Sequence, residues 1–407
     1  MHTLELALRS RVPLISVSTS DPVNAPEIIR RLAGCRIGVM NTLDVDNYRD
    51  KDGRLIEDED FYNVGVVYPH GEIVGTYEDI YEFAQLNDFS FVLLNTEYDS
   101  PLFMDIGEMP VPKEMIAERI EQVSPQDPVA DILAAVGGLD LKMITEILKI
   151  TQVRDGTVTA QGVVDTRKNV VPTVTGLSQL ETKMRFYEPS AAICEWVASN
   201  AHYVKDDDID PRLRPKGLLF NGLPGCGKTQ GAKYIAEALK LPLYLLDIAG
   251  LLNRYHGESE TNLIRALSRI DEESPCVVLM DEVEKLFFGT DEGTQNRLLA
   301  KLLWWLQERT SNAVVIMTCN DIDKLPKELY REGRIDRVVT FEGIKSQKHA
   351  TEFVKNMLST FEGYKRPTGT IISQAVSALV KEAGEQGVAH SKLAQVSEDL
   401  VKQFNPQ

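Results

Sequence analysis

The sequence predicts an α/β protein with two parallel-sheet units in tandem, followed by a helical domain. Short apolar runs, typical of buried strands, alternate with helical segments near the start of the chain. The same alternation returns with clearer signals after residue 172, and from residue 344 onward apolar residues recur at helical spacing. We therefore expect α/β units at 1–125 and 172–343, a helical segment and connector at 126–171, and a helical domain at 344–407.

The elements of the first part follow in order. A helix at 3–11 is stopped by Pro13, and the apolar run 14–18 is typical of a buried strand. Further strands are expected at 36–40 and 89–95. Further helices are expected at 26–32, 77–85, 112–122, 129–136 and 141–151. Residues 152–172 are polar with alternating valines, and we interpret them as a connector.

The second part repeats this order. Strands are expected at 217–221, 243–248, 276–280 and 313–318, and helices between them at 228–239, 258–270 and 295–308. In the last part, apolar residues at 354, 357, 358 and 361 fall on one face of a helix. Helices at 371–383 and 389–404 follow.

Composition limits the classes of function. The 407 residues carry 44 Lys and Arg against 61 Asp and Glu, a net charge of −17. Binding nucleic acid through a broad face needs clustered Lys and Arg, so this balance counts against it, although a local basic groove stays compatible with the sequence. Residues 44–60 hold eight carboxylates against three cations, a local charge of −5. This stretch is either a solvated loop or a docking surface for a basic partner.

The five cysteines and the apolar runs bear on the compartment. The cysteines are scattered and form no CxxC and no Cys/His pair at metal-ligand spacing, which indicates reduced thiols. No apolar run reaches the ~18–20 residues of a membrane span. The N-terminal residues lack a secretory signal pattern. We expect a cytoplasmic protein, or one in an equivalent reducing compartment.

A glycine-rich loop is the strongest chemical signal. Residues 222–229 match G-x-x-x-x-G-K-[ST], between a buried strand and an amphipathic helix. The glycines let backbone N–H groups point at phosphates, Lys228 reaches the β- and γ-phosphates, and Thr229 offers a hydroxyl to Mg²⁺. The residues expected to bind ATP are Gly222, Leu223, Pro224, Gly225, Cys226, Gly227, Lys228, Thr229 and Asp281.

An acidic pair ends the expected strand 276–280. Asp281 and Glu282 follow it directly. At the carboxyl end of a parallel strand beside the phosphate loop, Asp281 can hold Mg²⁺ through water, and Glu282 can polarise the attacking water as a general base. We expect an ATPase with Thr229 and Asp281 as its Mg²⁺ ligands.

From about residue 174 onward, the chain resembles an AAA+ ATPase module. Arg254-Tyr-His-Gly-Glu-Ser-Glu260 resembles the pore-loop segment of protein-remodelling AAA proteins, Met317-Thr-Cys-Asn320 resembles their sensor 1, and residues 330–337 resemble their second region of homology. The segments ELALRSRVPLISV, VGGLDLKMITEILKITQ and LLAKLLWWLQERT resemble one subfamily, the AAA ATPases of the hypothetical chloroplast reading frame type. In that subfamily a degenerate AAA-like unit precedes an active one.

The residues of the first part agree with degeneracy. After 14–18, Thr-Ser-Asp-Pro-Val-Asn contains no glycine and no Lys-Ser/Thr pair. After 89–94, Asn95 and Thr96 stand where a Walker B motif would offer Asp-Glu. Nucleotide chemistry is therefore expected in the second part.

The resemblance implies further roles. Asn320 would position the lytic water with Glu282, and Arg331 and Arg334 would be arginine fingers that act on the nucleotide of a neighbouring subunit. Fingers of this kind imply an oligomer, which in the family is a hexameric ring. Simpler interpretations are an asparagine that ends a strand and arginines on the surface.

The pore-loop resemblance implies a polypeptide substrate. Tyr255 would grip an extended chain, with Arg254 and His256 as helpers; the simpler interpretation is a tyrosine packed under a loop. Trp304 and Trp305 are adjacent and cannot share one helix face, so we expect one in the core and the other facing outward. Lys392 stands where AAA families place sensor 2, and either a phosphate contact or a plain helix face fits it.

Three functions compete at this stage. The leading hypothesis is a Mg·ATP-driven, ring-forming motor, a homo-hexamer, that remodels a protein substrate. The second is a nucleic-acid-associated AAA+ factor of the replication or clamp-loading type. The third is a nucleotide-gated assembly scaffold.

Overall fold

The computed structural model describes residues 3–49, 62–96, 100–171, 174–184, 186–206, 209–252, 258–287 and 292–405. The chain divides into two compact units. One comprises Met1–Ser124 and Leu139–Lys149, and the other comprises Pro125–Gly138 and Ile150–Gln407. The helical segment expected at 126–171 is therefore not a part of its own, because its residues are shared between the two units.

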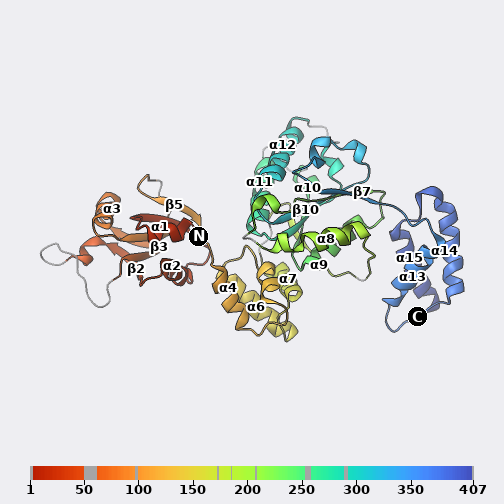
Figure 1. Cartoon of the computed structure of the whole chain (residues 1–407), viewed down its shortest axis with the longest axis horizontal. Helices are drawn as coiled ribbons and strands as arrows, with labels where there is room; N and C mark the ends of the chain where they lie inside the picture. The colour runs from red at the N-terminus through yellow and green to blue at the C-terminus, as the bar shows by residue number, and fades with distance from the viewer. Residues whose placement is uncertain are drawn as a thin grey trace. The chain divides into compact units, whose positions relative to one another are not determined.

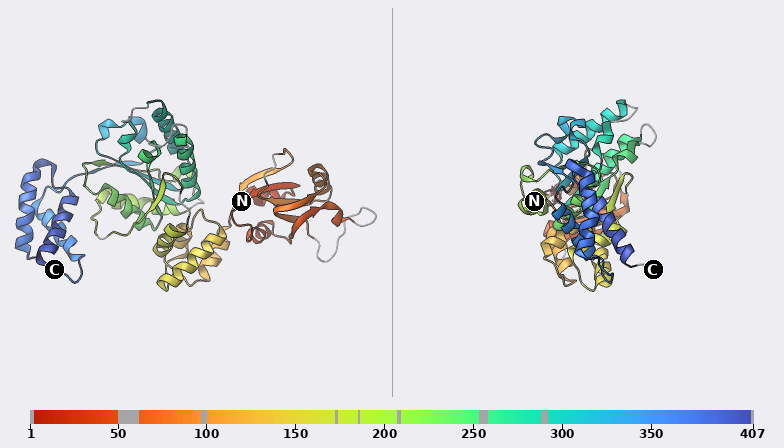
Figure 2. Two further views of the ribbon diagram at one scale, coloured as in Figure 1. Left: turned by 180° about the vertical axis from the view of Figure 1, so that it is seen from behind. Right: turned by 90° about the vertical axis from the view of Figure 1, so that its right-hand side faces the viewer.

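The first unit is a parallel sheet with helices on both faces (Figures 1 and 2). Its elements are α1 (Thr3–Arg9), β1 (Leu14–Ser18), α2 (Ala25–Ala33), β2 (Gly38–Asp44), β3 (Val64–Val74), α3 (Tyr77–Leu86), β4 (Ser90–Leu94), β5 (Met104–Glu108) and α4 (Lys113–Glu121). The strand order is β2-β3-β4-β1-β5. Apolar residues of α1 and α2 pack on one face of the sheet, and those of α3 pack on the other. The sequence predictions missed β3 and β5.

The second unit has a larger sheet, ordered β11-β7-β10-β9-β8-β6. Only β6 runs antiparallel to its neighbour. Before the lid, its elements are α5 (Val129–Ala135), part of α6 (Leu141–Asp155), α7 (Ala160–Val170), β6 (Leu177–Leu180), α8 (Ala191–Lys205), β7 (Gly217–Gly222), α9 (Lys228–Leu239), β8 (Leu243–Leu246), α10 (Ile248–Leu252), α11 (Glu258–Glu272), β9 (Cys276–Met280), the 3-10 turn η3 (Val283–Phe287), α12 (Glu292–Glu308), β10 (Ala313–Cys319), the 3-10 turn η5 (Lys327–Tyr330) and β11 (Arg337–Phe341).

Alternate residues of these strands face two separate cores. Val277 and Leu279 pack with α8 and α9 on one face, whereas Val278 and Met280 pack with α10, α11 and α12 on the other. Figure 1 shows these helices on the two sides of the sheet. Because both faces are covered, β9 and β10 are fully buried, and the chemistry is left to the strand ends.

A three-helix lid follows the sheet, coloured blue in Figures 1 and 2. It consists of α13 (Gln347–Ser359), α14 (Gly369–Ala383) and α15 (His390–Phe404), which share an apolar core. The expected helical C-terminal part is thus present as three helices. Among the described residues, no helix is long and apolar enough to cross a membrane.

The two sheets share one topology. With the five parallel strands of each unit numbered in chain order, the first sheet reads 2-3-4-1-5 and the second, without β6, reads 5-1-4-3-2, which is the same order from the other edge. By this order β4 corresponds to β10 and β3 corresponds to β9. The comparison of Asn95 with a Walker B motif was therefore wrong, because Asn95 follows β4 and occupies the position of Asn320.

The expected connector at 152–172 is also wrong, because it contains the end of α6 and all of α7. Thr159 caps α7 by accepting a hydrogen bond from the backbone N–H of Gly162 at 3.0 Å. Buried residues at 160, 163, 164 and 167 form one face of the helix. The last of these positions is Arg167, which is fully buried. A charged residue in the buried face hides the helical apolar pattern in the sequence.

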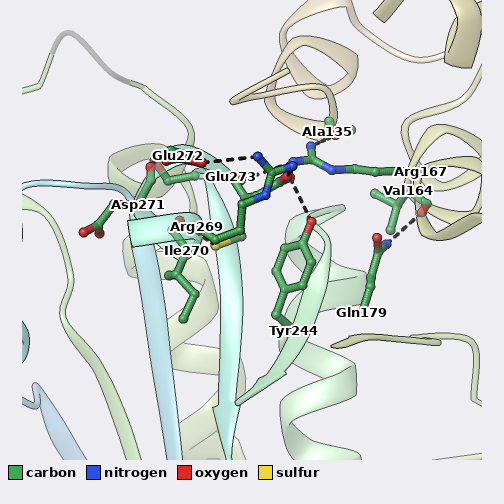
Figure 3. A network of polar contacts seen from close by, with 12 residues as sticks. Ala135, Val164, Arg167, Gln179, Tyr244, Arg269, Ile270, Asp271, Glu272 and Glu273 are labelled. Carbon is green, nitrogen blue, oxygen red and sulfur yellow. Dashed lines mark hydrogen bonds and ion pairs between the residues drawn. The ribbon is translucent and has the colours of Figure 1, made fainter. Parts of the chain in front are cut away.

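Arg167 belongs to a buried polar network that joins α7 to the end of α11 (Figure 3). Its guanidinium donates to the carbonyl of Ala135 at 2.8 Å and pairs with the Glu273 carboxylate, which is 1% exposed. Glu273 also accepts from the Tyr244 hydroxyl at 2.9 Å and pairs with Arg269. A buried charge needs such partners, so these contacts fix α7 against the sheet.

Candidate active site

The glycine-rich loop joins β7 to α9 and closes tightly on its surroundings. Gly222 has φ +152°, and a Cβ there would lie 2.1 Å from the carbonyl oxygen of Phe341 on β11. Gly225 has φ +79°, and a Cβ there would lie 2.2 Å from Oγ of Ser391 on the lid. The Ser391 N–H donates to the carbonyl of Gly225 at 3.0 Å. Both positions therefore require glycine, and the loop contacts the lid directly.

Lys228 begins α9 and points back over this loop. It is 8% exposed, and its Nζ donates to the carbonyl oxygens of Gly222 and Leu223 and, at 3.0 Å, to Oδ1 of Asn320. The ammonium group is thus held between the loop and the end of β10. A phosphate group in this position would replace some of these carbonyl acceptors.

Strands β9 and β10 run parallel and in register, with Met280 opposite Met317. Their carboxyl ends therefore place the acidic pair beside Thr318, whose Oγ1 donates to Oδ1 of Asp281 and accepts from the Glu282 N–H at 2.9 Å. Glu282 has φ +52°, a strained backbone for this residue. The Thr318 contact stabilises that turn and helps to present the Glu282 side chain to the cavity.

The electrostatics favour an ionised Glu282. The ion pair with Lys285 holds the pKa of the Glu282 carboxyl below its usual value, burial opposes this, and Asn320 and Lys228 lower it further. A carboxylate is the form that accepts a proton. Burial raises the pKa of the Cys226 thiol, so this loop cysteine is protonated at neutral pH.

A cavity of about 680 Å³ brings the expected residues together, a volume within the ~300–1,000 Å³ usual for small-molecule sites. Eight of them line it: Pro224, Gly225, Gly227, Lys228, Thr229, Asp281, Glu282 and Asn320. Gly222, Leu223 and Cys226 are not in its lining. Cys226 is buried in the loop, whereas Leu223 is 45% exposed.

The sequence did not predict the residues of the opposite wall of the cavity. This wall consists of Lys183, Met184, Phe186 and Tyr187 before α8, and Phe353, Met357, His390, Ser391, Ala394, Gln395 and Glu398 from the lid. No local motif marks these residues, because the fold of the lid brings them in. Burial lowers the pKa of His390, so its imidazole is neutral at pH 7.

The lid helix α15 does not turn Lys392 toward the cavity. Ser391, Ala394, Gln395 and Glu398 follow the i, i+3, i+4, i+7 spacing of one helix face and line it, and Lys392 lies outside that lining. The cavity lining therefore favours the interpretation that Lys392 lies on a plain helix face and makes no phosphate contact.

The expected Mg²⁺ ligands fit that ion. Asp281 and Thr229 line the same cavity, and Mg²⁺ typically takes one or two protein oxygens and completes its shell with phosphate oxygens and water. Among the described residues, no group of three or more His, Cys, Asp or Glu forms a complete metal cage. An ion that needs the nucleotide to finish its coordination suits this arrangement.

The expected fingers lie outside this cavity. Arg334 donates to the carbonyl of Glu328 and, at 3.1 Å, to Oε1 of Gln307 on α12, and Arg331 is exposed just after η5. Among the described residues that line the cavity, the cations are all lysines. Arg337 pairs with Glu195 at 3.5 Å, and Asp336 accepts the backbone N–H groups of Lys216 and Gly217 at 3.0 Å each.

The pore-loop resemblance implies three residues that would grip a polypeptide substrate. Arg254, Tyr255 and His256 lie outside the described residues.

The tryptophan pair separates as expected, because Trp305 is 5% exposed and packs in the core while Trp304 is 66% exposed on α12.

The corresponding loop of the first unit is filled by its own side chains. Asn95 accepts from the Thr19 N–H at 2.7 Å and donates to the Thr19 carbonyl at 2.9 Å. The Asp21 carboxylate is 2% exposed and accepts from the N–H groups of Asn24 and Lys142. A carboxylate bound to these N–H groups would repel a phosphate.

Comparison with known proteins agrees with this geometry. Residues 218–343 match the model of the family described as ATPase family associated with various cellular activities (AAA). An uncharacterized AAA domain-containing protein ycf46 of Trieres chinensis is 37% identical over 190 residues, which cover 42% of this chain and 38% of that protein. Peroxisomal ATPase PEX6 of Saccharomyces cerevisiae is 36% identical over 131 residues, 30% of this chain and 13% of PEX6.

Among solved structures, the crystal structure of the FIGL-1 AAA domain aligns with a TM-score of 0.44 at 17% identity, over 59% of this chain and 77% of that one. The chain spans well under half the length of the curated relatives it matches. The resemblance to AAA ATPases and to the chloroplast reading frame proteins is confirmed, and so is the P-loop AAA fold of the second unit.

Proposed function

We propose that the chain, whose residues 218–343 match the AAA ATPase family, is a Mg·ATP-hydrolysing motor that works as a ring and remodels a protein substrate. The observation that carries the ATPase part is the convergence of Lys228, Asp281, Glu282 and Asn320 on one cavity beside the phosphate loop. These groups come from the ends of two strands, β9 and β10, and the start of helix α9, so the fold itself assembles them.

The hydrolysis step follows from these positions. Water attacks the γ-phosphorus, the bond from that phosphorus to the bridging oxygen breaks, and ADP leaves with that oxygen. Glu282 accepts the proton of the water and returns it to phosphate, while Asn320 positions the water. Lys228 and the loop N–H groups offset charge on the phosphates. Mg²⁺ held by Thr229 and Asp281 would neutralise the charge that develops on the phosphate oxygens.

The ring is the quaternary part of the proposal. Arg331 and Arg334 lie outside their own cavity, and such cations accelerate phosphoryl transfer by ~10³–10⁵ where a neighbouring chain supplies them. A homo-hexamer would give every site a finger from the next chain. The polypeptide substrate rests on Tyr255 and its sequence context, with Arg254 and His256 beside it.

Two variants test the ATPase assignment. Lys228→Ala should abolish nucleotide binding. Glu282→Gln should retain Mg·ATP and lower its turnover by ~10²–10⁴, the range of general-base catalysis. Glu362→Gln, the same change at an exposed lid residue, is the matched control and should hydrolyse ATP like the parent. Full turnover in Glu282→Gln would contradict the assignment.

The same Glu282→Gln variant tests the substrate class. Held in the ATP state, it should retain an unfolded model polypeptide added in excess, and substitution of Tyr255 by Ala in that background should release it. Retention of single-stranded DNA or RNA instead of polypeptide would favour the nucleic-acid-associated alternative. Negligible parental turnover with nucleotide-dependent assembly would favour the scaffold.

A further inference from the structure

Glu284 is an acidic residue next to the site that takes no part in the proposed hydrolysis step. It lies two residues after Glu282, in the 3-10 turn η3, and is 8% exposed. Its Oε1 accepts the side-chain Nδ2 of Asn320 at 2.7 Å and the backbone N–H of the same residue at 3.0 Å. Its Oε2 is buried and has no hydrogen-bond partner among the described residues. Every hydrogen bond that the Glu284 side chain makes among the described residues is therefore to Asn320.

These contacts decide which way the Asn320 amide faces. Its Oδ1 accepts from Lys228 Nζ at 3.0 Å while its Nδ2 donates to Glu284. The flipped amide would set an oxygen against the carboxylate and an NH₂ against the ammonium, so both contacts would become repulsive. A carboxylate on one side and a cation on the other thus select one of two amide orientations.

The backbone N–H of Asn320 makes the acceptor itself unambiguous. A peptide N–H cannot turn into an acceptor, so whatever side chain occupies position 284 must present an oxygen to it. That same oxygen then meets Nδ2. Oxygen at this point is the requirement, and negative charge is not needed to meet it.

We propose that Glu284 is a positioning residue that holds the Asn320 amide with its oxygen on Lys228 and its second N–H directed away from Glu284, toward Glu282 and the cavity. This inference rests on the proposed ATPase function, and it assigns to the second acid after Asp281 a task different from that of Glu282. Asp281 accepts a hydrogen bond from Thr318, and Glu284 accepts one from Asn320. These two contacts join the ends of β9 and β10.

Three substitutions test the acceptor. Glu284→Met removes it and Glu284→Asp draws it back by one methylene, whereas Glu284→Gln keeps an oxygen for the Asn320 N–H. Misplacing a catalytic group by about 1 Å can cost ~10²-fold in rate, so we expect kcat to fall at least about tenfold in the Met and Asp variants with the Mg·ATP Kd within about threefold. Glu284→Gln should recover most of that loss. Glu362→Gln is the control, and the thermal midpoint of each variant is measured alongside.

An amide readout makes the test independent of turnover. In chain labelled with ¹⁵N-asparagine, the side-chain NH₂ of Asn320, assigned by its loss in Asn320→Asp, should exchange slowly with solvent in the parent and in Glu284→Gln. It should exchange fast in Glu284→Asp. Equal exchange in all three chains, or Gln as damaging to kcat as Asp, would overturn the inference. A parent that binds but never hydrolyses ATP, with the exchange pattern intact, would instead overturn the proposed function.

Discussion

At the carboxyl end of β9, three acidic residues within four positions have different environments. Asp281 accepts from Thr318, Glu282 pairs with the exposed Lys285, and Glu284 is buried against Asn320. The positive φ of Glu282 makes this separation possible, because it turns the chain between the first acid and the third. The sequence singled out the first two as candidate site residues, since they complete a strand-end motif. Nothing local distinguished Glu284 from a solvated turn residue.

The Lys285 ion pair predicts a pH effect. Because this contact is the main cause that lowers the Glu282 pKa, the carboxylate stays ionised further into acid than an ordinary glutamate. Lys285→Met should raise that pKa and so shift the acid limb of the kcat–pH profile to higher pH. Lys345→Met, which breaks a similarly exposed pair with Glu342, is the control and should leave the limb in place. A limb that does not move in Lys285→Met would remove Lys285 from this role.

Thr318 provides a second prediction at this scale. It is fully buried, and its hydroxyl both donates to Asp281 and accepts from the Glu282 N–H. Thr318→Val keeps the shape and removes both contacts. The exposed Asp281 carboxylate can bind water instead, so the cost of about 1–3 kcal/mol in the free energy of unfolding comes from the Glu282 N–H that loses its acceptor. Thr318→Ser should retain most of the stability because it retains the hydroxyl. Urea denaturation measures both, and a Val variant as stable as the parent would contradict the account.

Among the elements, buried strands were easier to predict than edges and packed helices. β9 and β10 have all residues buried and appear in the sequence as continuous apolar runs. β11 was missed because it is a short edge strand with three exposed residues of five, and β3 because glycine and a kink interrupt it. α7 was taken for a connector because its buried face ends in Arg167, whose partner Glu273 is 106 residues away. Patterns report burial only where the buried residues are apolar.

The network around Glu273 predicts an asymmetry in stability. Glu273→Ala leaves the fully buried Arg167 without a carboxylate, which should lower the free energy of unfolding by about 3–5 kcal/mol. Arg167→Met should cost less, because Glu273 keeps Arg269 and Tyr244. Glu272→Ala, which breaks only a half-exposed pair with Arg269, should cost less than about 1 kcal/mol. Chemical denaturation ranks the three, and the reverse order for the first two would refute this explanation.

For the whole molecule, the two units share the order of their parallel strands but differ in what occupies the loop after the first of these strands, which is β1 in one unit and β7 in the other. In the second unit glycines open the loop onto the cavity, and in the first Asp21 and Asn95 fill it. The glycine-rich motif alone predicted this difference between the two loops. The identical topology could not be predicted, because β3 and β5 carry no strong sequence signal.

The proposed ring makes a prediction about mixed assemblies. Lys228→Ala chains keep their arginines but lack a working site, and Arg334→Ala chains keep the site but lack a finger. Mixed at equal concentration, they should hydrolyse ATP severalfold faster than the sum of the two alone, because each Lys228→Ala chain can supply a finger to its neighbour. A mixture no faster than that sum would indicate that Arg334 does not act across chains.

We propose that one unit of the two binds nucleotide, through the cavity around Lys228. Equilibrium binding of a non-hydrolysable ATP analogue with Mg²⁺, measured as moles bound per mole of chain, tests it most directly. We expect one mole bound per mole of chain at saturation, and none in Lys228→Ala. Two per chain, or binding that survives in Lys228→Ala, would contradict it.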